Sequence, residues 1–474
     1  MNNKKIIILI LILFLFILIS CNKNNPSEDN QSPEIKEDEK EEKEEKPHEH
    51  IISDWIYPDD SECGDEVDAK RICTICGEVL ETEHTFRDHE LVKEIIEPTC
   101  EENGKEIEYC KNCTYHFERK LYKTGHEKSD YIIVKEATKT SAGIKQIKCL
   151  KCGKVLEEFK YVKNGYLDHG ALHVSGRDLY DKDNQKFQLY GLSYHGLQWF
   201  GKYVNHDTIC ALQQNFGINV IRLACYTTEN GYVDGGALVK SNYKDYIDKA
   251  IKCANEIGLY VVIDWHMVGA VDVKDKNPLS YIEDAKEFFT YVSTKYKDYN
   301  NIIYEIMNEP CGETTWDDCK EYANIIIPII RENTNAVILV GNPHWSSDLV
   351  SVEASPLTGY NNIMYTYHFY ANDIKIPDAV VDAYNAGLPV FISEFGFMDA
   401  TGDGAMNYTT GENWLKTLDN LNISYIAWNI SNSKGSASIL KQGNGTMTDF
   451  TDNNLKEWGI YLRNYYRLKS GIDN

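Results

Sequence analysis

Two glutamates in the stretch NIIYEIMNEPCG, residues 301–312, lie where an acid must either do chemistry or be paired. Glu305 and Glu309 fall in an apolar run, and side chains four positions apart on a strand point to the same side. A buried carboxylate costs free energy unless a partner stabilises it. A third glutamate, Glu394, ends another apolar run. Two carboxylates across a cleft, one protonated and one ionised, are the groups that cleave a glycosidic bond.

Neighbouring polar residues fit that chemistry. Asn308 can hydrogen-bond a sugar hydroxyl, and Arg222 can keep Glu394 anionic through an ion pair. Tyr370 can donate to the attacking carboxylate, and His368 can contact the acid or the substrate. The sequence therefore supplies a set of groups around the carboxylate pair as well as the pair itself.

Eight short apolar runs that alternate with amphipathic segments would position these residues. The predicted strands are 187–195, 220–226, 259–266, 302–310, 336–343, 363–370, 389–396 and 424–431. The predicted helices are 243–258, 282–299, 317–333 and 454–469. Nearly continuous apolar strands between helices indicate a parallel sheet covered on both faces. We predict an α/β fold, a (β/α)8 TIM barrel; a doubly wound open sheet is the alternative, but no GxGxxG follows the first strand.

Many polar residues lie in these runs, mostly near their C-terminal ends, which converge on one mouth of a barrel. They are Arg222, His266, Asn308, Glu309, His368, Tyr370, Glu394 and Trp428. Glu305 should lie about one layer deeper and pair with Arg222 or a neighbour. Glu305 as the catalytic acid is the alternative.

From about residue 165 to 467 the chain resembles glycoside hydrolase family 5, and within it the bacterial endoglucanases of subfamily 2. The similar blocks, in order, are 189–205, 220–227, 260–268, 302–310, 341–348, 364–371, 391–396 and 427–438. The resemblance implies a retaining double displacement, with Glu309 as acid/base and Glu394 as nucleophile. It implies an endo-β-1,4-glucanase (a cellulase) acting on cellulose or related β-glucans, with no cofactor for catalysis.

The resemblance also assigns residues around the pair. The active-site shell would be Arg222, His266, Asn308, His368, Tyr370 and Trp428. The substrate-binding positions would be His195, Trp199, Tyr226, Trp345 and Lys434, with Trp345 as the aromatic platform on the leaving-group side. Aromatic faces suit the apolar faces of pyranose rings.

Other functions remain open at this point. A β-mannanase or xyloglucanase would use the same catalytic residues. In a non-catalytic carbohydrate-binding or adhesion protein, the repeats described next would carry the function. The formal net charge of −24 argues against a nucleic-acid partner, because phosphate binding needs a basic face. We expect a monomer.

A cysteine pattern repeats across residues 48–164, which hold eight of the 14 cysteines. Three copies align: Cys63-x9-Cys73-x2-Cys76, Cys100-x9-Cys110-x2-Cys113 and Lys139-x9-Cys149-x2-Cys152. A period near 38 residues indicates small stacked units of β type.

Cysteines and histidines at such spacings favour structural zinc. We predict ligands at Cys63, Cys73, Cys76, Cys100, Cys110 and Cys113, with His50, His84 or His126 as the fourth. The third unit, which lacks its first cysteine, would be incomplete. Disulfides are the alternative in an exported protein. The units resemble the zinc-ribbon-like spacer repeats of clostridial-type surface proteins.

The N-terminus predicts export. Residues 1–21 combine two lysines, a 14-residue apolar run and the sequence Leu18-Ile19-Ser20-Cys21, which resembles a lipobox with Cys21 as the lipidated residue. An ordinary signal peptide, giving a secreted protein, or a short anchor is the alternative. Residues 22–47 read as a disordered charged linker. We therefore expect a lipid-anchored protein on the bacterial cell surface, with the repeats at 48–164 and the catalytic barrel at 165–470.

Overall fold

The computed structural model describes residues 48–138, 141–270, 272–443 and 448–473. These residues form two compact units. The first comprises the described residues up to Glu97 together with Gly104–Leu121, and the second comprises Pro98–Asn103 and the described residues from Tyr122 onward. The division falls inside the cysteine-rich segment that the sequence analysis treats as one domain.

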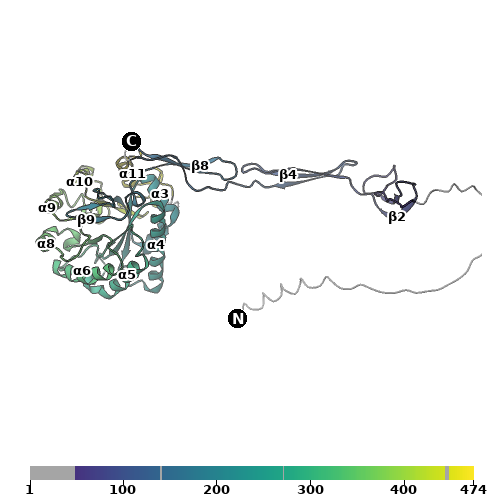
Figure 1. Ribbon diagram of the computed structural model, residues 1–474. Coiled ribbons are helices and arrows are strands. Elements are labelled where there is room, and N and C mark those ends of the chain that lie inside the picture. Colours follow the sequence, from purple (N-terminus) through teal and green to yellow (C-terminus); the bar gives the residue numbers. More distant parts are fainter. Residues whose placement is uncertain (1–47, 139–140, 271, 444–447, 474) are drawn as a thin grey trace, which may run out of the picture. The chain divides into compact units, whose positions relative to one another are not determined.

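Eight parallel strands close into a barrel in the order of the chain, with helices around them (Figure 1). The strands are β11 (Tyr190–Tyr194), β12 (Val220–Tyr226), β13 (Tyr260–His266), β14 (Ile302–Glu305), β15 (Ile338–Val340), β16 (Ile363–Tyr370), β17 (Val390–Gly396) and β18 (Tyr425–Ile430). Each lies within a predicted strand, and the predicted TIM barrel is confirmed. The strand that carries Glu305 ends there, so Glu309 lies beyond it, in the connection that follows.

The strands are apolar throughout because both of their faces are covered. Residues that alternate with the helix-facing positions form an interior cluster, with one member in or beside each strand: Leu189, Val220, Val262, Ile303, Leu339, Met364, Phe391 and Ile426. Two positions further along three of these strands, the same inward side carries Arg222, Asp264 and Glu305. The floor of the barrel is therefore apolar and the layer above it is charged.

Helices follow the strands and cover the outside of the barrel. The four predicted helices correspond to α4 (Gly236–Ile257), α5 (Ile282–Lys295), α6 (Trp316–Arg331) and α11 (Glu457–Ser470). Three further helices were not predicted: α3 (His206–Phe216), α9 (Asp378–Asn385) and α10 (Tyr408–Leu421). The shorter helical segments are α1 (Tyr166–His169), α2 (Leu197–Phe200), α7 (Pro343–Ser346), α8 (Leu349–Ala354), η1 (Gly201–Tyr203), η2 (Val273–Lys276) and η3 (Pro278–Tyr281).

A hairpin of β9 (His173–Ser175) and β10 (Asp178–Tyr180) precedes the barrel. Leu179 of this hairpin and nearby Leu172 belong to the interior apolar cluster. They therefore extend the apolar floor beneath the strands.

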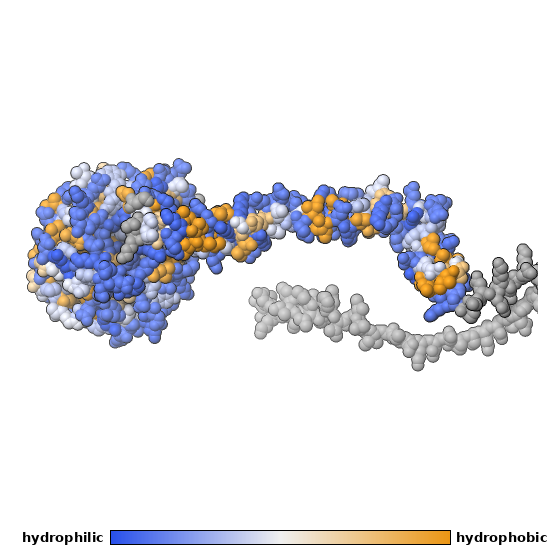
Figure 2. Space-filling view, turned by 45° about the horizontal axis from the view of Figure 1, so that its top comes forward, coloured by the Kyte–Doolittle hydropathy of each residue, from blue (hydrophilic) through white to orange (hydrophobic). Residues whose placement is uncertain are grey.

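The cysteine repeats form small antiparallel sheets, as predicted for β-type units. The first unit holds the pair β1 (Glu66–Ile72) and β2 (Val79–Phe86), and the three-stranded sheet β3 (Leu91–Ile96), β4 (Gly104–Cys110) and β5 (His116–Leu121). The second unit holds β6 (Ile132–Lys135), β7 (Gly143–Lys148) and β8 (Val155–Tyr161). Apolar side chains lie on the surface of these sheets, where Figure 2 shows orange patches.

The predicted signal peptide, the lipidation site Cys21 and the charged linker lie outside the described residues. Within the described part of the chain, no helix has the length and apolar character needed to cross a membrane.

Candidate active site

A cleft of about 640 Å³ opens at the C-terminal end of the barrel strands. Predicted residues from all eight strands or the connections after them line it: His195, Tyr226, His266, Glu309, Trp345, His368, Tyr370, Glu394 and Trp428. This convergence follows from the fold, because the carboxyl ends of parallel barrel strands all meet at one mouth.

The two glutamates face each other in this cleft. A carboxylate oxygen of Glu309 lies within 4.8 Å of one of Glu394, and His368 lies within the same distance of both. The side chain of Glu309 is 16% exposed and that of Glu394 is 7% exposed. The separation is that of carboxyl groups that act on opposite sides of one bond through a covalent intermediate, which are about 5–5.5 Å apart.

Arg222 organises the charges beneath the cleft. Its buried guanidinium pairs with Glu305 at 2.7 Å, Asp264 at 3.0 Å and Glu394 at 3.2 Å. It also donates to the side-chain oxygen of Asn308 at 2.7 Å. Although burial alone would lower the pKa of Arg222, the three carboxylates outweigh burial and raise it. Arg222 therefore stays cationic and favours the anionic form of Glu394, as predicted.

Glu305 is fully buried one layer below the mouth. Burial raises the pKa of a carboxyl group, but the attraction of Arg222 and His368 outweighs burial and lowers the pKa of Glu305 to about 2. An ionised carboxylate tied to Arg222 cannot act as a proton donor. The prediction that Glu305 pairs with Arg222 is confirmed, and its full burial outside the cleft lining favours Glu309 over Glu305 as the acid.

His368 links the two layers of acids. Its Nδ1 lies 2.8 Å from Oε1 of Glu309, and its Nε2 lies 2.9 Å from the hydroxyl of Ser393. Burial would lower the pKa of His368, but the hydrogen-bonded carboxylates of Glu305 and Glu309 raise it to about 10. The imidazolium therefore fixes the orientation of Glu309.

Glu394 has the environment of a buried anion with dedicated donors. The Tyr370 hydroxyl donates to its Oε1 at 2.8 Å. Burial, helped by the charge of Glu309, raises the pKa of Glu394 above its usual value, although His368, Arg222 and the Tyr370 hydroxyl oppose this. Burial and the adjacent carboxylates also raise the pKa of Tyr370 well above its usual value, so the phenol keeps the proton that it donates.

Aromatic rings form one wall of the cleft. The ring of His195 lies 5.4 Å from Trp199, 5.9 Å from Tyr226 and 5.1 Å from Trp428, measured between centroids. The rings of His266 and Trp428 are parallel, with centroids 5.3 Å apart. Burial lowers the pKa of His195 to about 4, so its ring is neutral at physiological pH. A neutral aromatic wall suits the apolar face of a sugar ring.

Trp345 lines the cleft and is 54% exposed. It sits in a turn in which His344, Trp345 and Ser346 all have positive φ angles, between 54° and 57°. Such left-handed geometry costs free energy for a residue with a Cβ and persists where the surroundings hold it. Here Pro310 accepts from the backbone N–H of Trp345 at 3.0 Å, and Asn308 accepts from the Ser346 hydroxyl at 2.5 Å. The turn that presents Trp345 is thus bonded to the segment that carries Glu309.

Two predicted substrate-binding residues are not part of the cleft lining: Trp199, which packs beside His195, and Lys434. Lys434 is exposed and lines a separate hollow with Asp403 and Gly404. Asp264, which was not predicted, pairs with Arg222 and lies 2.6 Å from Nδ1 of His266. Its signal was a carboxylate in the otherwise apolar run LYVVIDWH, two positions before His266.

The cysteine ligands group differently from the prediction. Cys63 lies with Cys110 and Cys113 of the next repeat rather than with Cys73 and Cys76. The third repeat is not incomplete, because a cysteine of the preceding repeat, Cys100, joins Cys149, Cys152 and His126. His84 is in none of these groups, and its ring instead contacts Asp68 and Glu66. His48 and His89, which the prediction did not include as ligands, take part.

Comparisons with known proteins agree with this geometry. Residues 180–434 match the model of the family described as cellulase, glycosyl hydrolase family 5. Endoglucanase A of Butyrivibrio fibrisolvens is 43% identical over 298 residues, which cover 62% of this chain and 68% of that protein. An endoglucanase of Clostridium saccharobutylicum is 39% identical over 298 residues, which cover 62% of this chain and 64% of that protein. The match thus leaves about a third of each relative uncovered.

Solved structures show the same likeness. The cellulase Cel5C_n has a TM-score of 0.61 at 34% identity, over 65% of this chain and 95% of that chain. The catalytic domain of Thermobifida fusca endoglucanase Cel5A has a TM-score of 0.60 at 31% identity, over 64% of this chain and 99% of that chain. The family match, the closed barrel and the paired glutamates at its mouth lead to one conclusion: this chain belongs to glycosyl hydrolase family 5.

Proposed function

We propose that the protein is a retaining endo-β-1,4-glucanase that hydrolyses internal bonds of cellulose or a related β-glucan. The observation that carries this proposal is the distance within 4.8 Å between oxygens of Glu309 and Glu394 in an open cleft. An inverting pair stands farther apart, at about 6.5–9.5 Å, to leave room for a water molecule.

In the first step, Glu394 attacks the anomeric carbon while the bond to the glycosidic oxygen breaks. Glu309 gives its proton to that oxygen, so the leaving chain departs as an alcohol and a glycosyl ester remains on Glu394. Arg222 and Tyr370, both bonded to Glu394, hold the carboxylate in place for the attack.

In the second step, a water molecule attacks the same carbon from the face that the leaving chain vacated. Glu309 now takes a proton from the water, the ester bond breaks, and Glu394 recovers its carboxylate. Two displacements on one carbon restore the original β configuration. His368 holds Glu309 in both steps through the contact at 2.8 Å.

The β-1,4-glucan specificity rests on the aromatic wall and on the relatives. A variant of the Thermobifida fusca endoglucanase, 30% identical to this chain, was solved in complex with cellotetraose. The blocks that resemble subfamily 2 include the residues of the aromatic wall here. A β-mannanase or a xyloglucanase remains the second candidate, because nothing in the carboxylate pair distinguishes these polymers.

Product analysis tests both parts of the proposal. Cello-oligosaccharide hydrolysis followed by proton NMR should first release the β anomer, and early release of the α anomer would contradict retention. On purified polymers, cellulose and mixed-linkage glucan should give the highest kcat/KM, with a rapid fall in viscosity. Higher values on mannan or xyloglucan would favour the second candidate, and no reducing sugar from any polymer would favour a non-catalytic binding protein.

We also propose that a lipid on Cys21 holds the enzyme at the cell surface. The support is the sequence of residues 1–21 and the charged stretch after it. Cells expressing the protein should incorporate labelled fatty acid into it and retain it in the membrane fraction. Cys21→Ala should lose both the label and the membrane association, and equal retention of the variant would contradict the anchor.

A further inference from the structure

The cysteine repeats have very little apolar core. Among the described residues between 48 and 164, the buried apolar and cysteine side chains are Ala69, Cys73, Cys100, Cys110, Ala137, Ala142, Ile147 and Cys149. Half of them are cysteines, while larger side chains such as Phe86 and Ile95 are 61% and 59% exposed. Units this small usually need a metal or disulfides to stay folded. The cysteines therefore have to supply what the core lacks.

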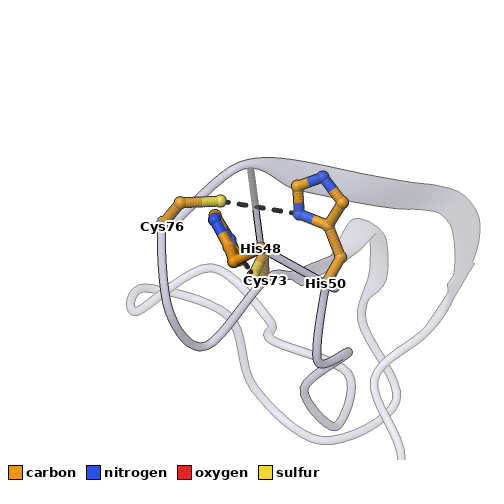
Figure 3. A group of neighbouring side chains, drawn as sticks. All are labelled: His48, His50, Cys73 and Cys76. Carbon is orange, nitrogen blue, oxygen red and sulfur yellow. Dashed lines mark hydrogen bonds between the residues drawn. The ribbon is translucent and has the colours of Figure 1, made fainter. Parts of the chain in front are cut away.

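All eight cysteines of this region gather with four histidines into three tetrads. The first is His48, His50, Cys73 and Cys76, the second is Cys63, His89, Cys110 and Cys113, and the third is Cys100, His126, Cys149 and Cys152. Within each tetrad the candidate ligand atoms lie within 4.8 Å of one another. Figure 3 shows the four side chains of the first tetrad gathered around one point.

The distances within the tetrads are those of a tetrahedral metal site. With Zn–S near 2.3 Å and Zn–N near 2.0–2.1 Å, the edges of a tetrahedron are about 3.8 Å between two sulfurs and about 3.6 Å between sulfur and nitrogen. The Sγ–Sγ distances are 3.4 Å for Cys63–Cys110 and 3.7 Å for Cys100–Cys149. The Sγ–N distances are 3.5 Å for Cys73–His48, 3.6 Å for Cys76–His50, 3.4 Å for Cys113–His89 and 3.6 Å for Cys152–His126.

Disulfides fit the same groups poorly. A disulfide joins two sulfurs at about 2.05 Å, well below the Sγ–Sγ distances here. The second and third tetrads each hold three cysteines, so any pairing within them leaves one thiol over. A disulfide framework also gives no reason for a histidine nitrogen to lie beside the sulfurs in every group. Thiolate and imidazole ligands in a tetrahedron favour zinc among the common metals.

We propose that the three tetrads are structural zinc sites and that the second and third each take one cysteine from the preceding repeat. Cys63 precedes β1, yet it completes the site formed by Cys110, the last residue of β4, and Cys113, which follows that strand. Cys100, from the connection between β3 and β4, completes the site of Cys149 and Cys152 after β7. Each shared ion therefore ties a repeat to the one before it in the chain.

Ligand sharing explains two irregularities of the repeat. The second and third sites follow one pattern, C-x25-H followed by C-x2-C after 20 or 22 residues. The first site has no preceding repeat, and His48 supplies its fourth ligand. The third repeat has Lys139 where the others have a cysteine, and no further repeat follows that would need one.

Metal counting on paired variants of the full chain distinguishes shared sites from sites within single repeats. Protein purified under reducing conditions with zinc, then equilibrated with a competing chromophoric chelator, should retain about three zinc ions per chain. Cys63→Ser and Cys110→Ser should each lose one ion, and the double variant should also lose only one. Cys63→Ser with Cys73→Ser should lose two. His84→Ala, a histidine of the same region outside the tetrads, should keep all three.

Ligation within single repeats predicts the reverse, namely one ion lost for the Cys63 and Cys73 pair and two for the Cys63 and Cys110 pair. That result would overturn the shared sites. Iron in place of zinc would overturn the metal assignment, and metal-free protein with no free thiols among the eight cysteines would overturn the sites altogether. None of these outcomes depends on glucanase activity.

Discussion

At the residue scale, one buried guanidinium sets the charge of the whole site. Arg222 pairs with Asp264, Glu305 and Glu394, so three acids share one cation. Arg222, Asp264 and Glu305 are fully buried beneath the mouth, whereas Glu394 lines the cleft. Removing one member of such a group leaves the others with an uncompensated charge. The layer beneath the mouth therefore supports the reaction without touching the substrate.

The hydroxyl of Tyr370 should contribute to the rate through Glu394. A hydrogen bond to a charged group contributes about 1.5–3 kcal/mol, and about 1.4 kcal/mol corresponds to tenfold in rate. Tyr370→Phe should therefore lower kcat by roughly ten- to a hundredfold. Tyr367→Phe is the matched control, because Tyr367 is buried on the same strand and packs its ring against Trp414. Equal kcat values for the two variants would show that the contact at 2.8 Å has no catalytic role.

His195 should make the fold sensitive to acid. Burial lowers its pKa to about 4 from an ordinary value of 6.5, and its Nδ1 is buried with no partner in the part of the chain that the structure describes. Between pH 6.5 and 4 the unfolded chain binds a proton there that the folded chain does not, so the free energy of unfolding falls as pH falls. The melting temperature of His195→Gln should fall less steeply than that of the wild type over this range, whereas parallel curves would contradict the assignment.

The residues of the site could be predicted from the sequence where a polar group interrupts an apolar strand. Glu305, Arg222 and Glu394 were found in this way, and the contacts of Tyr370 and His368 were predicted correctly. Lys434 was assigned by resemblance alone, and it lies in a neighbouring hollow. Asp264 interrupts an apolar strand in the same way, but the prediction considered only Glu305 and Glu394 as partners of Arg222.

At the element scale, the barrel was predictable because each strand is a single apolar run. Among the missed helices, α9 spans only eight residues, whereas α3 and α10 each follow a capping asparagine, Asn205 and Asn407, a start signal that the prediction did not use. The end of β14 at Glu305 was also beyond the sequence, since the apolar pattern continues to Met307. Strand ends depend on pairing with the neighbouring strand, which a single sequence does not show.

The start of α6 offers a test of local stability. Thr315 caps this helix in a capping box with Asp318, in which each side chain accepts from the backbone of the other. Thr315→Ala should lower the free energy of unfolding by about 1 kcal/mol, as loss of such a cap does. Urea denaturation followed by tryptophan fluorescence measures this change, and Thr315→Ser, which keeps the hydroxyl, should stay close to the wild type. A loss as large in Thr315→Ser would show that the hydroxyl is not the stabilising group.

At the scale of the whole molecule, the chain combines parts that are stabilised in different ways. The barrel has a large apolar core, whereas the repeats bury few apolar side chains and gather their cysteines in three tetrads. The repeat period was visible in the sequence, but the sharing of ligands was not, because the cysteines of one copy bind in two different sites. Only the folded structure shows which cysteines lie beside which histidine.

Removal of zinc should destabilise the repeats and leave the barrel unaffected. A chelator under reducing conditions should speed proteolytic cleavage within residues 48–164, because metal binding contributes directly to the folding of such small units. Hydrolysis of short soluble cello-oligosaccharides should change by less than about twofold, since none of the three tetrads includes a residue of the cleft. Unchanged proteolysis would contradict structural metal sites, and zinc added back should restore protection.

Covalent trapping tests the central claim most directly, namely that Glu394 attacks the sugar while Glu309 serves as acid and base. A 2-deoxy-2-fluoro cellobioside with a dinitrophenyl leaving group needs little help from an acid, and its fluorine slows hydrolysis of the ester. Mass spectrometry of the digested protein should find one sugar per chain, on the peptide that contains Glu394. A label on Glu309 instead, or an active enzyme that accumulates no label, would contradict the account.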